Sequence, residues 1–282
     1  MQTKIKFLLI LLVFSLLCLN LFAQTPAQPF KVEVSGKGKQ AIVFIPGFAC
    51  SGDVWKDTRA LYEPTHTCYT LTMAGFAGVP AQGTPSFKNW EAAIANYIQA
   101  NHIEKPIIIG HSMGGGLALA LAADYPDMMS KIVVVDALPC LAALMNPSFQ
   151  SKENNDCSPI VTQMTSMSNE QFAQMQQMSM KRLVTDTTKS SLIVSWSVQS
   201  DRTTFGQIYC DFYNTDLRNK LTNIKCPSLI LLEAPFVSYK ASVEAQYKEL
   251  KTAQLAYANK GLHFIMYDDA AWYKEQLTAF IK

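Results

Sequence analysis

Hydrophobic and polar positions divide the chain into short apolar runs that alternate with segments of helical periodicity. Residues 40–46, 107–109 and 131–136 are apolar on both faces, a pattern typical of strands inside a sheet. Residues 67–72, 226–233 and 254–258 also predict strands, whereas residues 30–36 alternate and predict an exposed or edge strand. Helices are predicted at residues 86–101, where Ser86 can cap the first turn, and at 113–125, 242–251 and 269–281. This alternation predicts the α/β class, with a mostly parallel central sheet flanked by helices.

The pattern changes in residues 139–222, which contain no strong strand signal and are rich in methionine. Residues 169–183 and 186–200 predict amphipathic helices, and Asp186 can cap the second. We therefore expect a helical cap, or lid, of residues 139–222, inserted after the strand that ends at Asp136. The core would then consist of residues 24–138 and 223–282. Five cap side chains are expected to line an apolar substrate pocket: Met164, Met175, Trp196, Phe205 and Tyr209.

The first 23 residues have the pattern of a secretory signal peptide. Lys4 and Lys6 precede an apolar run over residues 7–22, and cleavage is expected near Ala23. The mature protein would then be periplasmic or secreted. Lipid anchoring at Cys18 is an alternative, although Leu17 is large where a lipoprotein signal uses a small residue. The apolar run is short and interrupted for a membrane anchor, so no stable membrane insertion is expected after the signal is removed.

Charge and cysteine content narrow the range of partners. Removal of the leader would take away two lysines and no acidic residue, which lowers the formal net charge from +2 to zero. A neutral chain without a basic block is a poor candidate for nucleic-acid binding. Six of the seven cysteines would remain, and an exported protein can pair them in ways that spacing does not determine. Their scattered positions do not resemble a zinc site, and oligomeric state is left open.

The most informative stretch is residues 106–115, where a run of three isoleucines leads into Gly110-His-Ser-Met-Gly114 and then into a helix-forming segment. A G-x-S-x-G pattern between a strand and a helix is the nucleophile elbow. The glycines leave room beside a serine in a strained turn, and the helix N-terminus favours negative charge there. We expect Ser112 to be a nucleophile.

A serine hydroxyl needs a general base, and His263 is the best-placed candidate. It follows the last predicted strand, and loops after parallel strands meet at the edge where ligands bind. His66, His102 and His111 are expected to be structural or solvated. An oxyanion would need two N–H donors, for which we expect the amides of Met113 and Phe48, with Ala49 as the alternative to Phe48. Asp136 and Glu233 each end a predicted strand, so either can supply the carboxylate behind the base.

These segments resemble the α/β-hydrolase-fold serine hydrolases, a superfamily of esterases, lipases and aminopeptidases. The resemblance rests on residues 46–48, 75–78, 110–114 and 261–268, and on the order nucleophile, acid, histidine. Most members place the acid after the penultimate strand, where this chain has Phe236. Haloalkane dehalogenases of one arrangement resemble the chain at Asp136 instead, so the resemblance favours Asp136 over Glu233.

The resemblance implies an exported serine hydrolase that cleaves an ester, or an amide, of a small to medium apolar substrate through an acyl-enzyme. Family members that act on halides or epoxides use Asp where this chain has Ser112. No cofactor or metal is expected. One alternative is a prolyl-type aminopeptidase that acts on a short peptide and holds its amine with Glu170, Asp186 or Asp201. The other is a non-catalytic binding protein on the same fold.

Overall fold

The computed structural model describes residues 28–282, so the predicted signal peptide and Cys18 lie outside the described residues. The strands form one sheet of seven, in the order β1-β3-β2-β4-β5-β6-β7. β1 pairs with β3 in antiparallel register, and every other pairing is parallel. The strands are β1 (Phe30–Gly36), β2 (Gln40–Ile45), β3 (His66–Met73), β4 (Ile107–His111), β5 (Lys131–Val135), β6 (Ser228–Leu232) and β7 (Ala253–Tyr257).

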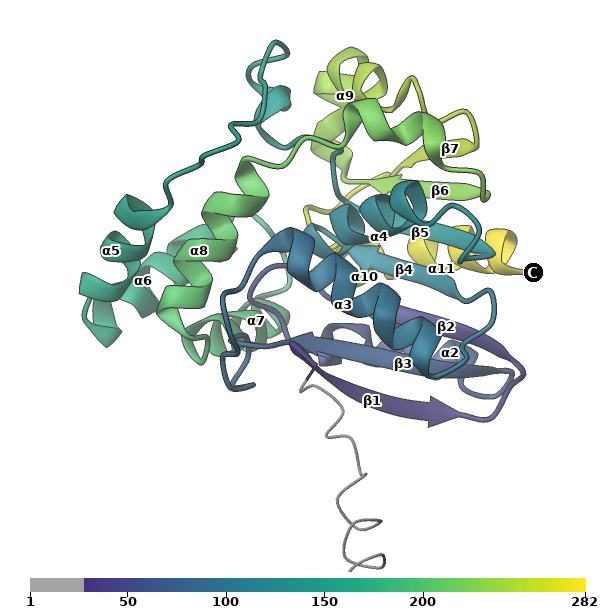
Figure 1. Cartoon of the computed structure of the whole chain (residues 1–282), viewed down its shortest axis with the longest axis horizontal. Coiled ribbons are helices and arrows are strands. Elements are labelled where there is room, and N and C mark those ends of the chain that lie inside the picture. The colour runs from purple at the N-terminus through teal and green to yellow at the C-terminus, as the bar shows by residue number, and fades with distance from the viewer. Residues whose placement is uncertain (1–27) are drawn as a thin grey trace, which may run out of the picture.

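Helices cover both faces of this sheet (Figure 1). The core helices are α2 (Lys56–Tyr62), α3 (Phe87–Ala100), α4 (Met113–Asp124), α9 (Lys240–Tyr247), α10 (Ile265–Asp268) and α11 (Ala270–Ile281). Short 3₁₀ helices are η1 (Gly52–Trp55), η2 (Ala142–Leu144), η3 (Arg218–Asn223) and η4 (Ala234–Tyr239). Alternate residues of each central strand enter different apolar clusters. In β2, Val43 and Ile45 face the cluster of α3, α4 and α9, whereas Ile42 and Phe44 face the cluster of α2 and α11.

The cap is helical and lies between β5 and β6 in the sequence. It contains α5 (Ser158–Ser166), α6 (Asn169–Met180), α7 (Thr187–Val198) and α8 (Arg202–Tyr213). These four helices gather at one end of the sheet, on the left of Figure 1. A disulfide between Cys157 and Cys210 ties the start of α5 to α8. Cys50, Cys68, Cys140 and Cys226 are free and buried.

The predicted α/β architecture is confirmed, with small shifts at the element ends. Ser86 caps α3 by accepting a hydrogen bond from the Asn89 amide, and Asp186 caps α7. The predicted final helix is α11, which begins at Ala270 and follows the short α10. Among residues 28–282, no helix combines the length and the apolar character needed to cross a membrane.

Candidate active site

Ser112 occupies a strained turn between β4 and α4. Its φ of 53° and ψ of −122° lie where a residue with a side chain is rarely found. A Cβ on Gly110 would come within 2.0 Å of the Gly114 carbonyl oxygen, and one on Gly114 within 2.3 Å of the Ile45 carbonyl oxygen. Both positions therefore require glycine. The Ser112 amide donates to the Val135 carbonyl at 2.8 Å, which fixes the turn against β5.

The loop after β2 lies directly against this serine. A Cβ on Gly47 would come within 2.7 Å of His111 Nδ1 and 3.3 Å of the Ser112 Cβ, so glycine lets this loop lie close against the elbow. Phe48 and Met113 therefore flank Ser112 from two different segments. No hydrogen bond from either amide to another group is recorded within residues 28–282. Unpaired N–H groups beside a nucleophile suit an oxyanion.

His263 lies in the loop between β7 and α10, with Asp136 beneath it. Nδ1 of His263 is 2.6 Å from Oδ2 of Asp136. The Asp136 side chain is only 1% exposed, whereas the imidazole is 22% exposed and reaches the pocket. The other carboxylate oxygen of Asp136 accepts the Glu233 amide at 2.7 Å. With Nδ1 donating to Asp136, Nε2 is left as the basic nitrogen.

Two opposing effects act on the charge of His263. Burial disfavours the imidazolium, but the hydrogen bond to Asp136 and the charges of Asp136 and Glu233 outweigh it and raise the pKa of His263 above 6.5. The Glu233 carboxyl lines the same pocket, and none of the hydrogen bonds within residues 28–282 joins it to His263. Burial, followed by the charge of Asp136, raises the pKa of Glu233 to about 7. Of the two candidate carboxylates, Asp136 is the one in contact with the histidine.

The hydrogen bond between His111 and the backbone of His263 was not predicted from the sequence. Nε2 of His111 donates to the His263 carbonyl oxygen at 2.9 Å, across 152 positions of the chain. Burial, and then the proximity of His263, hold the pKa of His111 well below 6.5, so the ring is neutral. Its position inside the elbow gave no sign of this partner. His111 was expected to be structural, and it supports the backbone of His263.

A cavity of about 660 Å³ opens beside Ser112 and His263. It is lined mainly by apolar side chains of the cap, including the predicted Met164, Met175, Phe205 and Tyr209. The prediction for Trp196 was wrong. Ile193 and Ser197 of α7 line the cavity, whereas Trp196 is not among the lining residues and is buried in the apolar cluster with Met180.

The cap acids proposed for an aminopeptidase do not line this cavity. Asp186 and Asp201 cap the N-termini of α7 and α8. Glu170 is exposed in the first turn of α6 and accepts a hydrogen bond from Ser168. Two of these acids serve as helix caps and the third is exposed, so none of them supports the peptidase alternative.

Comparison with known proteins agrees with this fold. The family model described as alpha/beta hydrolase fold matches residues 40–269, which is most of the chain. The chain belongs to the alpha/beta hydrolase fold family.

Individual relatives of this hydrolase are distant. A pimeloyl-[acyl-carrier protein] methyl ester esterase of Wigglesworthia glossinidia brevipalpis is 24% identical over 213 residues, which cover 72% of the hydrolase and 77% of the relative. A protein of the same name from Pectobacterium carotovorum is 25% identical over 111 residues, which cover 39% and 42% of the two chains. The match to that relative therefore spans less than half of its length.

Solved structures agree on the fold. The enol-lactonase of Burkholderia xenovorans LB400 has a TM-score of 0.73 with this hydrolase at 14% sequence identity. The superposition covers 89% of the hydrolase and 96% of the lactonase. At this level of identity, the likeness concerns the architecture alone.

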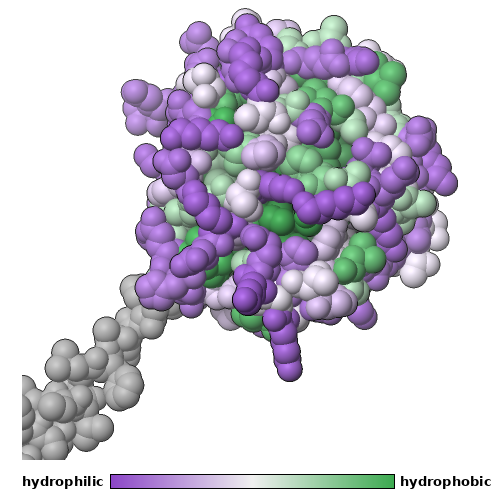
Figure 2. Space-filling view, turned by 90° about the vertical axis from the view of Figure 1, so that its right-hand side faces the viewer, coloured by the Kyte–Doolittle hydropathy of each residue, from purple (hydrophilic) through white to green (hydrophobic). Residues whose placement is uncertain are grey.

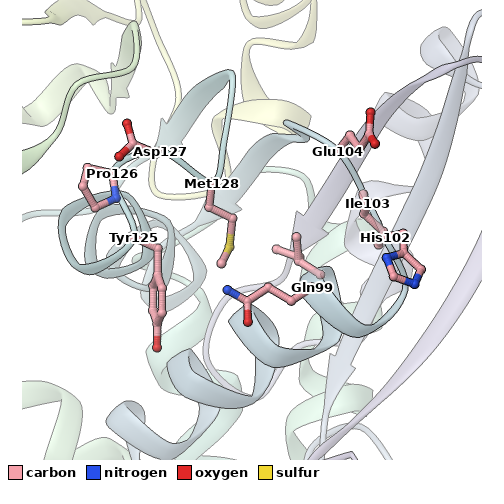
Figure 3. Close-up of a pocket in the computed structure, with 9 residues that line it drawn as sticks. Gln99, His102, Ile103, Glu104, Tyr125, Pro126, Asp127 and Met128 are labelled. Carbon is pink, nitrogen blue, oxygen red and sulfur yellow. The ribbon is translucent and has the colours of Figure 1, made fainter.

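A second hollow, of about 440 Å³, lies between the C-terminal ends of α3 and α4 (Figure 3). Met128 and Gln99 point toward each other across it, and the carboxylates of Glu104 and Asp127 lie at separate rims. Figure 2 shows the side of the hydrolase that lies opposite the cap, where hydrophilic residues surround a few hydrophobic ones. The second hollow has no serine or cysteine among its lining residues. Within residues 28–282, no cluster of His, Cys, Asp and Glu has the arrangement of a metal site.

Proposed function

We propose that this hydrolase is an exported serine esterase whose catalytic triad is Ser112, His263 and Asp136. The observation that carries the proposal is the 2.6 Å contact between His263 Nδ1 and Asp136 Oδ2, in the same cavity as Ser112 on its strained turn. A nucleophile, a base and a buried carboxylate in this relation are the elements of acyl transfer.

The proposed reaction has two halves. Ser112 Oγ attacks the ester carbonyl as His263 Nε2 accepts its proton, and the Phe48 and Met113 amides stabilise the oxyanion. Asp136 stabilises the imidazolium, which then protonates the departing alcohol. Water, activated by the same histidine, attacks the acyl-enzyme and releases the carboxylic acid and Ser112.

The substrate is proposed to be an ester with a small to medium apolar group. The cavity of about 660 Å³ is lined largely by aliphatic, methionine and aromatic side chains, which suit an apolar acyl or alcohol moiety. Relatives that carry the name of a methyl ester esterase make a small alcohol leaving group a reasonable first choice. Methyl and p-nitrophenyl esters of graded acyl length are therefore the substrates to assay.

Variants at two positions test the proposed triad. Ser112→Ala should lower kcat/KM for a p-nitrophenyl ester by about 10³-fold or more, and Asp136→Asn by a comparable factor, because the histidine loses its partner. Steady-state hydrolysis, with circular dichroism to confirm folding, measures both. Aminoacyl amides are expected to be poor substrates. Near-full activity in Asp136→Asn would overturn its assignment, and unchanged activity in Ser112→Ala would overturn the enzyme mechanism.

Export is proposed on the pattern of residues 1–23. The N-terminus of the protein isolated from its native host tests it, since cleavage near Ala23 gives a chain that begins close to Gln24. A chain that retains Lys4 and Lys6 would contradict export by cleavage.

A further inference from the structure

Three consecutive residues of the histidine loop are held by three different parts of the hydrolase. The Leu262 amide donates to Oδ2 of Asp268 at 3.0 Å, and the His263 carbonyl accepts from His111 Nε2 at 2.9 Å. The Phe264 amide donates to the Leu183 carbonyl at 3.1 Å. The backbone on both sides of His263 is therefore fixed, and one of the three anchors, Leu183, belongs to the cap.

Asp268 joins this loop to the cap a second time. Oδ1 accepts the Thr185 hydroxyl at 2.7 Å and the Thr185 amide at 3.0 Å, while Oδ2 accepts the Leu262 amide at 3.0 Å and shares the Thr185 amide at 3.1 Å. One carboxylate thus bridges two segments, Thr185 of the cap and Leu262 of the histidine loop. Gly261 permits the arrangement, because at φ +94° a Cβ there would meet the Asp268 Cβ at 2.7 Å.

The cap also contacts the other wall of the pocket. The centroid of the Phe48 ring lies 4.5 Å from that of Phe205 and 5.9 Å from that of Tyr209, and both partners belong to α8. The loop that carries the Phe48 amide and the loop that carries His263 therefore both rest on cap residues. The cap is part of the framework that sets the distance between them.

We propose that Asp268 is a positioning residue that couples the cap to His263, through Thr185 on one side and Leu262 on the other. The inference rests on the proposed function, since it assigns Asp268 an effect on the base of that reaction. Asp268 is absent from the lining of the cavity, so it acts through the loop and not on the substrate. An error of about 1 Å in the position of a base is sufficient to slow proton transfer substantially.

Isosteric variants on both sides of the bridge test the proposal. Asp268→Asn keeps the shape but replaces one acceptor oxygen with an NH2 donor, so it cannot accept all of the hydrogen bonds that Asp268 accepts from Thr185 and Leu262. Thr185→Val removes the hydroxyl from the other end. Each should lower kcat about 10-fold while KM stays within about twofold. Thr185→Ser keeps the hydroxyl and should retain wild-type kcat, as should Thr187→Val, whose side chain makes no hydrogen bond recorded within the described residues.

The pH profile separates positioning from a loss of fold. The titratable groups around His263 are Asp136, Glu233 and His111, and Arg182 of the segment after α6 lines the same cavity. A displaced imidazole contacts Asp136 less well, so the acid limb of kcat/KM should move to lower pH in Asp268→Asn and Thr185→Val. Melting curves control for folding.

The outcomes distinguish this inference from the function on which it rests. Loss of kcat with a shifted acid limb in both variants, and less than additive loss in the double variant, supports the bridge. Wild-type kcat in both variants, or a lower melting temperature with an unmoved acid limb, overturns the coupling while the esterase stands. A wild-type chain that neither hydrolyses esters nor reacts at Ser112 overturns the proposed function itself.

Discussion

Two carboxyl groups that enter the cavity from neighbouring strands set the charge of His263. Asp136 follows β5 and contacts the imidazole, and Glu233 follows β6 and acts at longer range. Both stabilise the imidazolium and so raise the pKa of His263. In the proposed reaction His263 must be neutral to accept a proton, so these charges would determine the pH below which activity is lost.

Glu233→Gln should therefore move the acid limb of kcat/KM to lower pH. Glu233 is ionised in a growing fraction of molecules as the pH approaches and passes about 7. Without that negative charge the imidazolium is less stable there, so the neutral base persists into more acidic solution. Activity at the optimum should stay within about threefold of wild type, because the Asp136 contact remains. Ester hydrolysis from pH 4 to 9 measures the shift, and exposed Glu275→Gln is the control. An acid limb that moves to higher pH in Glu233→Gln would contradict this account. So would a loss of kcat/KM as large as that of Asp136→Asn, because Glu233 would then act as more than a distant charge.

Residue-level predictions from the sequence succeeded where the local pattern contained the information. Gly110 and Gly114 of the elbow are needed because a Cβ at either position would collide with nearby backbone, as the motif implied. Strand ends alone did not separate Asp136 from Glu233. The resemblance favoured Asp136, and the fold places the Asp136 carboxylate in contact with His263. The His111 contact spans 152 positions, and no local pattern encodes it.

At the scale of elements, the packing of α3 on α4 buries an acidic side chain. Glu91 of α3 is 7% exposed. Its neighbour Asp124 ends α4 and is paired with Lys220 at 2.6 Å. Burial, and then the charge of Asp124, raise the pKa of Glu91 to about 7. The folded chain thus binds this proton more tightly than the unfolded chain does, and the contribution to stability that is present below pH 4.5 is lost as the pH rises through about 7.

Glu91→Gln should accordingly stabilise the protein at pH 8 and change it little at pH 4.5. The gain at pH 8 should be on the order of 1 kcal/mol, because residual solvent screens the penalty. Urea unfolding at the two pH values measures it, with exposed Glu153→Gln as the control. An equal effect of Glu91→Gln at both pH values would show that the proton plays no part.

Elements with a clear period were predictable, and short ones were not. The central strands and α3 follow from apolar runs and a capping serine. The seven-residue α2 has no comparable signal, and α5 and α8 depend on tertiary contacts that include the Cys157–Cys210 disulfide. Trp196 was misplaced because methionine and aromatic residues on a helix do not indicate which side faces the cavity.

For the molecule as a whole, the cap is held to the core at several separate points. The Asp201 amide donates to the Gly75 carbonyl, and the Phe87 amide donates to Asp211, each at 2.7 Å. The segment of residues 75–78, noted in the sequence, thus contacts the cap through the Gly75 carbonyl. These contacts, together with the hydrogen bonds of Asp268 to Thr185, hold the cap over the carboxyl ends of the strands, where the cavity, Ser112 and His263 lie.

Reaction with a fluorophosphonate tests the central claim most directly, because Ser112 Oγ must displace fluoride with help from His263. Peptide mass spectrometry of the wild-type chain should place the phosphonyl group on Ser112. The rate should rise as His263 loses its proton and should fall sharply in His263→Ala and Asp136→Asn, and Ser112→Ala should stay unlabelled. A folded wild-type chain that takes up no label, or label that persists unchanged in Ser112→Ala, would contradict the account.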